Sequence, residues 1–417
     1  MKKETISLIK NTSWQALARL VMLACSLTVT YFLTKFLGVE AWGDYVFITT
    51  TILMIFNLAD LGTGTITVKK LAKTKTSLKK RKTILNQAFT LKMIFSFAAL
   101  LLLAILVLIL NQFQGIRTLT LSSALVIIFL TWRTLAESFF MANLNFFAKT
   151  VFETSASLIS LLGIGLIIII KKNITLDWAL FIWVLATGLS AIAAIIHLKK
   201  QISLPTLSIK KGLREFLNQS IPVGVRQLVF ALYDAGIDSF FLKTLIGASA
   251  VGFYGLSYKI YANLILGAAF FMNSLFPVII KNPPHHLSAT LKQGFWVLLT
   301  TGIIIGLLMF ALAPTIINLI GGEAFSPAVK ILKILSLALV FGYLNHLTGY
   351  TMIALGAQKQ LLYLSLGALA INLTGNWLLI PAFGAIGAAW VTVATEGSMF
   401  ISTGIFLFKR LKSKTQN

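Results

Sequence analysis

The stretch NTSWQALARLVMLACSLTVTYFL, residues 11–33, is an apolar run that holds a single charged side chain, Arg19. It is long enough to cross a bilayer as one helix, because the hydrocarbon core takes about 20 apolar residues in that form. Similar runs recur to the end of the 417-residue chain, of which 57% is hydrophobic and only 12% charged. The sequence therefore predicts an all-α polytopic membrane protein.

Twelve transmembrane helices are expected from these runs and from the short segments that separate them. The predicted spans are residues 11–37, 42–60, 85–110, 118–141, 148–170, 176–198, 218–245, 250–280, 290–320, 328–355, 360–381 and 385–408. No soluble domain is expected between them.

The formal net charge of +24 has a topological explanation. Lysine and arginine gather in short segments such as KKLAKTKTSLKKRK (69–82), KKQISLPTLSIKKGLR (199–214) and KRLKSK (409–414), all on one side of the predicted spans. The opposite side carries Lys35, Arg117, Lys171, Lys172 and Lys243. Because basic loops stay in the cytoplasm, both termini are expected there. Contact with membrane lipids, and not with nucleic acid, follows from this pattern.

An internal duplication relates the two halves of the chain. NTSWQALARL (11–20) and NQSIPVGVRQ (218–227) share asparagine, serine and arginine at one offset. YFLTKFLGVEAWGDY (31–45) and FFLKTLIGASAVGFY (240–254) share three small residues and a tyrosine at nearly the same offset. Two matching blocks in the same order indicate a repeat.

Six spans in each half return the chain to the same side of the membrane, so the halves are expected to be parallel repeats. That geometry is typical of transporters whose site lies between the repeats near the bilayer midplane. We therefore expect two pseudosymmetric six-helix bundles, residues 1–205 and 206–417, around a central cavity.

The chain also resembles a family through motifs that occur in order along its length. They are FLGVEAWGDYVF, DSFFLKTLIGASAVGFYGLSYKI, LIGGEAFSPAVKILKILSLALVFGYLNHLTGYTMIALGAQKQ and NLTGNWLLIPAFGAIGAAWVTVATE. The set is similar to the O-antigen-type oligosaccharide flippases of the multidrug/oligosaccharidyl-lipid/polysaccharide exporter superfamily. This resemblance implies alternating access that moves undecaprenyl-pyrophosphate-linked oligosaccharide from the cytoplasmic to the outer leaflet of a bacterial plasma membrane.

Three cations are candidates for holding the pyrophosphate. Arg19 and Arg226 occupy equivalent positions in the repeats, about eight residues, or ~12 Å, into their predicted helices. Guanidinium binds phosphate oxygens bidentately, so the pair is expected to face the cavity. Snorkelling to the headgroups is the alternative. Lys259 is a third candidate, although its repeat equivalent is Thr50.

Three acidic residues within the spans are candidates for coupling transport to H⁺ or Na⁺. Asp234 and Asp238 are one helical turn apart in ALYDAGIDSFF, and Asp238 matches an acidic position frequent in the resembling flippases. Two close carboxylates favour cation or proton binding. Glu396 stands in the last span. The alternative for the two aspartates is hydrogen bonding to a neighbouring helix or a place near the outer interface, and for Glu396 it is a packing role.

Other charged and metal-binding residue types point to structure rather than chemistry. Arg133 and Glu137 lie four residues apart with opposite charges and are expected to neutralise each other. Cys25 is the only cysteine, and the four histidines are scattered except for His285 and His286. The sequence shows no catalytic constellation and no phosphate-binding loop, so we expect neither enzymatic activity, nor a cofactor, nor a metal site.

Two alternatives to the flippase are open. One is an ion-coupled multidrug exporter of the same superfamily, against which a cationic cavity argues. The other is a membrane enzyme such as a polymerase or ligase, against which the short external connections argue. The protein is expected to be a monomer, with a polysaccharide polymerase as a candidate partner.

Overall fold

The computed structural model describes residues 2–74, 77–208, 212–232, 236–281 and 284–415. Throughout these ranges the regular structure is helical, in agreement with the predicted all-α class. The chain divides into two compact units, residues 1–231 and 232–417. Each is described here by itself.

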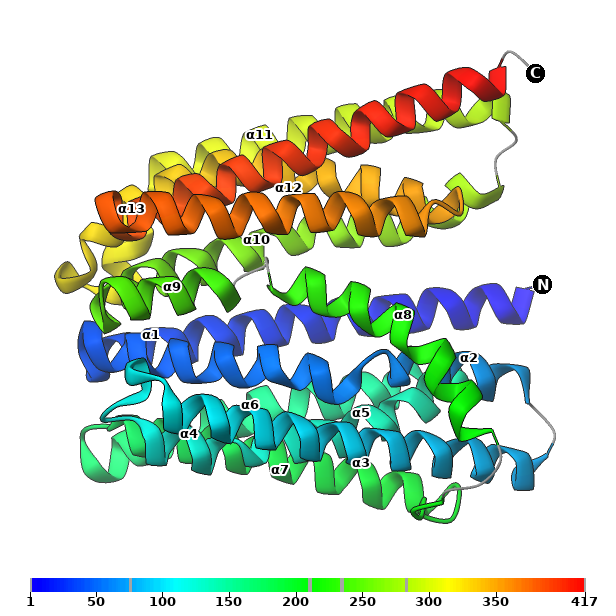
Figure 1. The fold of residues 1–417 in the computed structure, drawn as a ribbon, viewed down its shortest axis with the longest axis horizontal. Coiled ribbons are helices and arrows are strands. Elements are labelled where there is room, and N and C mark those ends of the chain that lie inside the picture. Colours follow the sequence, from blue (N-terminus) through cyan, green and yellow to red (C-terminus); the bar gives the residue numbers. More distant parts are fainter. Residues whose placement is uncertain (1, 75–76, 209–211, 233–235, 282–283, 416–417) are drawn as a thin grey trace. The chain divides into compact units, whose positions relative to one another are not determined.

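The first unit contains eight α-helices and one short 3₁₀ turn within its described residues (Figure 1). They are α1 (Lys2–Asp60), α2 (Thr63–Lys73), α3 (Leu78–Ile109), η1 (Asn111–Phe113), α4 (Arg117–Ser123), α5 (Leu125–Ala142), α6 (Phe146–Lys171), α7 (Leu176–Lys199) and α8 (Leu213–Ala231). Helix α1 packs on α3, α5 and α6, and α5 packs on α7.

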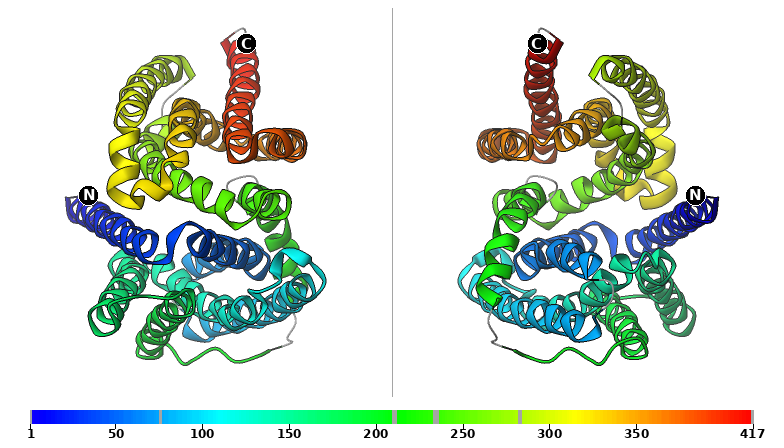
Figure 2. Two further views of the ribbon diagram at one scale, coloured as in Figure 1. Left: turned by 90° about the vertical axis from the view of Figure 1, so that its left-hand side faces the viewer. Right: turned by 90° about the vertical axis from the view of Figure 1, so that its right-hand side faces the viewer.

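The second unit is built around one central helix. Its elements are α9 (Ile237–Leu245), α10 (Ala248–Lys281), α11 (Pro284–Gly321), η3 (Glu323–Phe325), α12 (Pro327–Ala354) and α13 (Gln358–Thr415). Helix α12 packs on α10, α11 and α13, and α9 packs on α10 and α13. Figure 2 views the helices of each unit nearly end-on.

Two helices are each long enough for two membrane crossings, and each doubles back at a glycine (Figure 1). Helix α1 has 59 residues and α13 has 58, whereas about 20 residues cross a bilayer. The breaks fall at Gly38, with φ 72°, and Gly384, with φ 56°, a region that glycine enters without steric cost. Each helix therefore supplies two of the predicted spans.

Length and composition identify nine helices within the described residues as candidate spans, with α1 and α13 among them. Counting those two as pairs accounts for eleven of the predicted crossings. The seventh predicted span, 218–245, falls on α8 and α9, which lie on either side of residues 233–235. The described helices thus agree with the predicted arrangement of spans.

The structure differs from the expected boundaries in three places. The basic segment 69–82 is helical up to Lys73 and again from Leu78. Helix α1 begins at Lys2, so Arg19 lies further into its helix than the expected eight residues. Helix α8 begins at Leu213, before the expected start of the seventh span at residue 218, and continues through Pro222 to Ala231.

The duplication is visible in the backbone. Gly38 and Gly247 are equivalent in the repeat, and both have positive φ, 72° and 125°. Tyr45 and Tyr254, also equivalent, are both buried. The sequence repeat and the packing unit nevertheless end at different places, because α8 belongs to the second repeat but packs in the first unit. The boundary at 205/206 stays a prediction about the repeat.

Helix α8 is fastened to the first unit where α1 ends and α2 begins. The turn between them holds Leu61 (φ 35°) and Gly62 (φ 76°). A Cβ at Gly224 would lie 2.3 Å from the Leu61 carbonyl carbon, and one at Gly62 would lie 2.5 Å from the Ser220 carbonyl oxygen. Only glycine allows the two backbones to approach this closely.

Side chains extend this contact along α8. Lys70 of α2 pairs with Glu215 of α8 at 3.3 Å and lies over the ring of Phe216. Phe216 is fully buried in a core cluster with Leu85 and Phe140. Helix α8 is therefore part of the core of the first unit.

Replacing Gly224 with alanine is expected to destabilise the protein by about 1–3 kcal/mol, because a backbone atom blocks the added methyl group. Gly367 in α13 is the matched control, since a Cβ there meets nothing within 4 Å. Gly367→Ala is expected to be neutral or stabilising. Thermal unfolding in detergent, followed by size-exclusion chromatography, measures both; equal melting temperatures for the two variants would contradict the described packing.

Candidate functional site

A cluster of five charged side chains lies within the first unit. Glu153 of α6 is at its centre and pairs with Lys149 at 2.7 Å and with Arg19 of α1 at 3.4 Å. Lys149 is four residues before Glu153 on the same helix, a spacing that brings side chains together. Arg19 is 39% exposed, so its guanidinium is the accessible member of this group.

Arg133 and Glu137 of α5 complete the cluster. Arg133 Nε lies 3.2 Å from Glu137 Oε1, which confirms the predicted neutralisation within one helix. Neither of these two atoms has a hydrogen-bond partner with good geometry among the described residues. The contact is therefore an ion pair that leaves hydrogen-bonding capacity unused.

Arg226 lies in α8, which the structure places in the first unit together with Arg19. Its side chain is half-buried and has no ion-pair partner among the described residues. An unpaired guanidinium within a membrane-spanning segment is costly unless it reaches headgroups or a ligand. That Arg19 and Arg226 face a common cavity stays a prediction.

Lys259 lies in α10 of the second unit and is half-buried. Its carbonyl oxygen accepts a hydrogen bond from Asn263 Nδ2 at 2.8 Å, one turn further along the helix. The structure thus places Lys259 in a different unit from the two arginines. Its role beside them stays a prediction.

Asp238 lies in the first turn of α9 and is buried to 1% exposure. Its carboxylate accepts hydrogen bonds from Tyr254 of α10 at 2.5 Å and from Asn376 and Asn372 of α13 at 2.6 and 3.2 Å. The Tyr254 hydroxyl is also 2.9 Å from Thr392 Oγ1. The hydrogen bonding expected under the packing alternative is present, and it joins three helices. Asp234, the other expected acid of this pair, lies outside the described residues.

The surroundings of Asp238 are rich in buried oxygen atoms. Asn376 Oδ1 is buried and has no hydrogen-bond partner among the described residues. The two ends of an asparagine amide are assigned from the hydrogen-bond network. Rotating the Asn376 amide by half a turn would therefore direct its Oδ1 atom, in place of Nδ2, toward Asp238. Carboxylate, amide and hydroxyl oxygens are the donors that hard cations prefer.

Glu396 of α13 is held by Asn345 of α12. Asn345 Nδ2 donates to the Glu396 side chain at 2.6 Å and to its carbonyl oxygen at 2.9 Å. These hydrogen bonds tie Glu396 to a neighbouring helix, and its role in packing or in coupling stays a prediction. No group of three or more His, Cys, Asp or Glu side chains suited to a metal ion occurs in the part of the chain that the structure describes.

A second buried ion pair was not expected from the sequence. Lys92 of α3 is fully buried and pairs with Asp60 at the end of α1, and its ammonium is 3.1 Å from Thr134 Oγ1. The pair links three helices beside the turn that receives α8. The available signal was that Lys92 is the only charged residue between residues 83 and 110.

Two apolar units that bury ion pairs and hydrogen-bonded acids within membrane-spanning helices have the organisation of a polytopic membrane protein. Comparison with known proteins agrees. The family model for polysaccharide biosynthesis protein matches residues 8–282, so the chain belongs to that family. The MatE family model matches residues 222–378.

Solved structures with the same fold are membrane transporters. An inward-facing multidrug resistance MATE family transporter of the MOP superfamily has a TM-score of 0.75 at 13% identity and covers 95% of this chain and 99% of its own. The lipid II flippase MurJ, in an inward closed conformation, has a TM-score of 0.77 at 16% identity, over 96% and 87% of the two chains. These likenesses confirm the predicted fold class.

Curated relatives share part of the sequence. An uncharacterized membrane protein of Methanocaldococcus jannaschii is 27% identical over 200 residues, 48% of this chain and 46% of the relative. The teichuronic acid biosynthesis protein TuaB of Bacillus subtilis is 25% identical over 191 residues, 43% and 38% of the two chains. The chain thus matches less than half the length of either relative. The chain is thus a multi-pass membrane protein of the polysaccharide biosynthesis family, with the fold of these solved transporters.

The ion pair of Lys92 and Asp60 yields a testable consequence. Lys92→Met leaves Asp60 without its partner and is expected to destabilise the protein by about 3–5 kcal/mol. The double variant Lys92→Met/Asp60→Asn removes both charges and is expected to regain most of that loss. Thermal unfolding of the wild type, the two single variants and the double variant measures the coupling; additive effects would contradict the pairing.

Proposed function

We propose that the protein moves undecaprenyl-pyrophosphate-linked oligosaccharide from the cytoplasmic to the outer leaflet by alternating access. Membership of the polysaccharide biosynthesis family supports a sugar-containing substrate. The likeness to a lipid II flippase supports a lipid-linked form. The relative named for teichuronic acid biosynthesis favours an acidic polysaccharide.

The observation that carries the proposal is the shared carboxylate of Glu153. When Arg19 turns toward an anionic headgroup, Glu153 keeps Lys149 at 2.7 Å. The carboxylate is therefore not left unpaired in the membrane, which would cost several kcal/mol. Arg19 is thus paired with Glu153 in the absence of substrate and can bind pyrophosphate when it arrives. Arg226 and Lys259 are the further cations of the proposed site.

The proposal also covers the oligomeric state, the orientation in the membrane and a partner of the protein. The protein would act as a monomer in the bacterial plasma membrane, with both termini cytoplasmic, since the basic segments and the tail lysines lie on that side. Catalysis is not part of the proposal, because the family and the structural neighbours are transporters and flippases. A polysaccharide polymerase that extends the exported sugar is the candidate partner.

Native mass spectrometry of the purified protein tests the headgroup site. Wild-type protein is expected to carry polyprenyl-pyrophosphate species, and Arg19→Gln/Arg226→Gln at least about tenfold less, because each lost charge-assisted hydrogen bond weakens binding by roughly that factor. Arg214→Gln, an exposed arginine of α8, is the matched control and is expected to behave as wild type. Equal lipid content in the double variant would contradict the assignment of these arginines.

Ion coupling is proposed at Asp238, whose buried carboxylate lies among Asn372, Asn376, Thr392 and the Tyr254 hydroxyl. A bound Na⁺ would neutralise the Asp238 carboxylate, which the Tyr254 hydroxyl and the asparagine amides stabilise by hydrogen bonds in its absence. Asp234 and Glu396 are the secondary candidates.

Exchanging choline chloride for sodium chloride is expected to raise the melting temperature of the wild type. The stabilisation reaches about 2.7 kcal/mol when sodium is at 100 times its dissociation constant. Asp238→Asn is expected to abolish the shift, whereas Asp177→Asn, an exposed acid of α7, should retain it. If sodium still raises the melting temperature of Asp238→Asn, the proposed site is contradicted. If only a lower pH raises the melting temperature of the wild type, the coupling ion is a proton.

The match of the MatE model to residues 222–378 favours one second candidate, an ion-coupled multidrug exporter. The two functions separate in proteoliposomes. Uptake of a fluorescent organic cation, driven by a sodium or proton gradient, is expected to be absent for the flippase and present for the exporter.

A further inference from the structure

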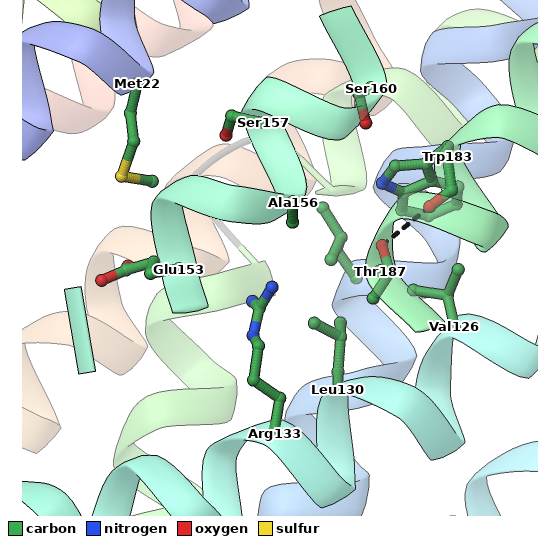
Figure 3. Close-up of a pocket in the computed structure, with 11 residues that line it drawn as sticks. Met22, Val126, Leu130, Arg133, Glu153, Ala156, Ser157, Ser160, Trp183 and Thr187 are labelled. Carbon is green, nitrogen blue, oxygen red and sulfur yellow. Dashed lines mark hydrogen bonds between the residues drawn. The ribbon is translucent and has the colours of Figure 1, made fainter. Parts of the chain in front are cut away.

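The first unit has an open cavity of about 230 Å³ beside the charge cluster (Figure 3). It lies among α1, α5, α6 and α7. Its lining combines apolar side chains with an arginine, a carboxylate, hydroxyl groups and an indole. Pockets for drug-sized ligands have volumes of roughly 300–1,000 Å³, so this cavity suits one small unit and not an oligosaccharide.

The Arg133 guanidinium projects into the cavity, and Glu153 lines it from α6 with its carboxylate directed away from Arg133 (Figure 3). The cluster holds three cations, Arg19, Lys149 and Arg133, against two carboxylates, Glu137 and Glu153. While Arg19 stays on Glu153, one positive charge is in excess within membrane-spanning helices, where uncompensated charge is expensive; when Arg19 turns to the pyrophosphate, the remaining four charges balance. A monoanion bound at Arg133 would remove that excess.

Hydroxyl groups and an aromatic ring complete the lining. Ser157 and Ser160 lie three residues apart on α6, and no described residue bonds to either hydroxyl. Thr187 donates its hydroxyl hydrogen to the Trp183 carbonyl oxygen at 2.8 Å. The Trp183 indole offers the flat apolar surface and the polar N–H that this residue type brings to mixed ligands. Glu153 adds oxygens that accept hydrogen bonds from ligand hydroxyls.

We propose that this cavity is a subsite for one carboxylate-bearing sugar unit. The carboxylate pairs with Arg133, the ring hydroxyls bond to Glu153, Ser157 and Ser160, and the ring packs against Trp183. The inference rests on the proposed function, since it names which sugar the transported oligosaccharide contains. Each group that it uses belongs to the first unit, and the pyrophosphate cations Arg226 and Lys259 take no part.

The mixture of groups favours this ligand over two simpler ones. A bare inorganic anion would use Arg133 but not the carboxylate of Glu153, which repels it. An organic cation would meet the excess positive charge of the cluster. A hydroxyl-rich monoanion satisfies both the guanidinium and the carboxylate.

Isothermal titration calorimetry on the full chain in nanodiscs tests the proposal with D-glucuronate, D-glucose and acetate. Glucuronate carries both the carboxylate and the hydroxyls, so it is expected to bind at least about tenfold more tightly than glucose or acetate, each of which lacks one charge-assisted or several neutral hydrogen bonds. Equal affinities for glucuronate and glucose, or binding of acetate as tight as that of glucuronate, would overturn the proposal.

Variants connect the binding to the cavity. Arg133→Gln/Glu137→Gln removes the guanidinium without leaving Glu137 unpaired, and it is expected to weaken glucuronate at least about tenfold. Ser157→Ala/Ser160→Ala is expected to weaken it by about three- to tenfold per hydroxyl. Arg214→Gln is the control. Unchanged affinity in the serine variant would overturn the proposal even if the charge variant did not fold.

The outcome is separable from that of the proposed function. Soluble glucuronate needs neither a lipid carrier nor transport. If the protein does not bind glucuronate but still carries polyprenyl-pyrophosphate, the subsite proposal is contradicted and the flippase proposal holds with a neutral sugar as substrate. If the protein binds glucuronate but carries no polyprenyl-pyrophosphate, the subsite proposal holds and the flippase proposal is contradicted.

Discussion

Glu153 binds two cations, and this sharing underlies the organisation of the first unit. A charged group in a membrane-spanning helix is stable only when it is paired or reaches water. Lys149 holds the carboxylate from within α6, and Arg19 holds it from α1. Because one partner suffices to compensate the carboxylate, the other is free to move. Arg19 can therefore remain within the helical bundle without being required for the stability of the fold.

The two units solve the cost of buried charge differently. In the first, cations and carboxylates pair directly, as in Lys92 with Asp60 and Arg133 with Glu137. In the second, Asp238 is surrounded by amide and hydroxyl groups. Its equivalent in the first repeat is Val29. The duplication therefore preserved the positive-φ glycine and the buried tyrosine, while the polar side chains of the two repeats diverged.

The fold was predictable from sequence because apolar length is a strong signal. The runs of apolar residues predicted the crossings, and the glycine motif of the repeat marked the break that the structure places at Gly38. Packing between helices was less predictable. The place of α8 depends on a backbone approach at Gly62 and Gly224 that has no signature beyond two ordinary glycines.

The candidate site was predictable in part. The sequence singled out Arg19 because a lone charge in an apolar run is conspicuous. It singled out Asp238 because Asp234 precedes it by one helical turn and because it matches an acidic position of the resembling flippases. It did not reveal Glu153 as the partner of Arg19, since the two are far apart in the chain. It also missed Lys92, whose partner Asp60 stands at a helix end where an acid is unremarkable. Pairing across helices is a property of the fold, not of local spacing.

The central claim is that this chain transfers a lipid-linked sugar across the bilayer. The most direct measurement uses proteoliposomes that hold polyprenyl-pyrophosphate oligosaccharide in both leaflets, with a membrane-impermeant glycosidase outside. With wild-type protein, the enzyme is expected to cleave nearly all of the lipid-linked sugar, because the inner pool is continually brought to the outer leaflet. Cleavage that stops at the outer-leaflet pool, as in liposomes without protein, would contradict the account.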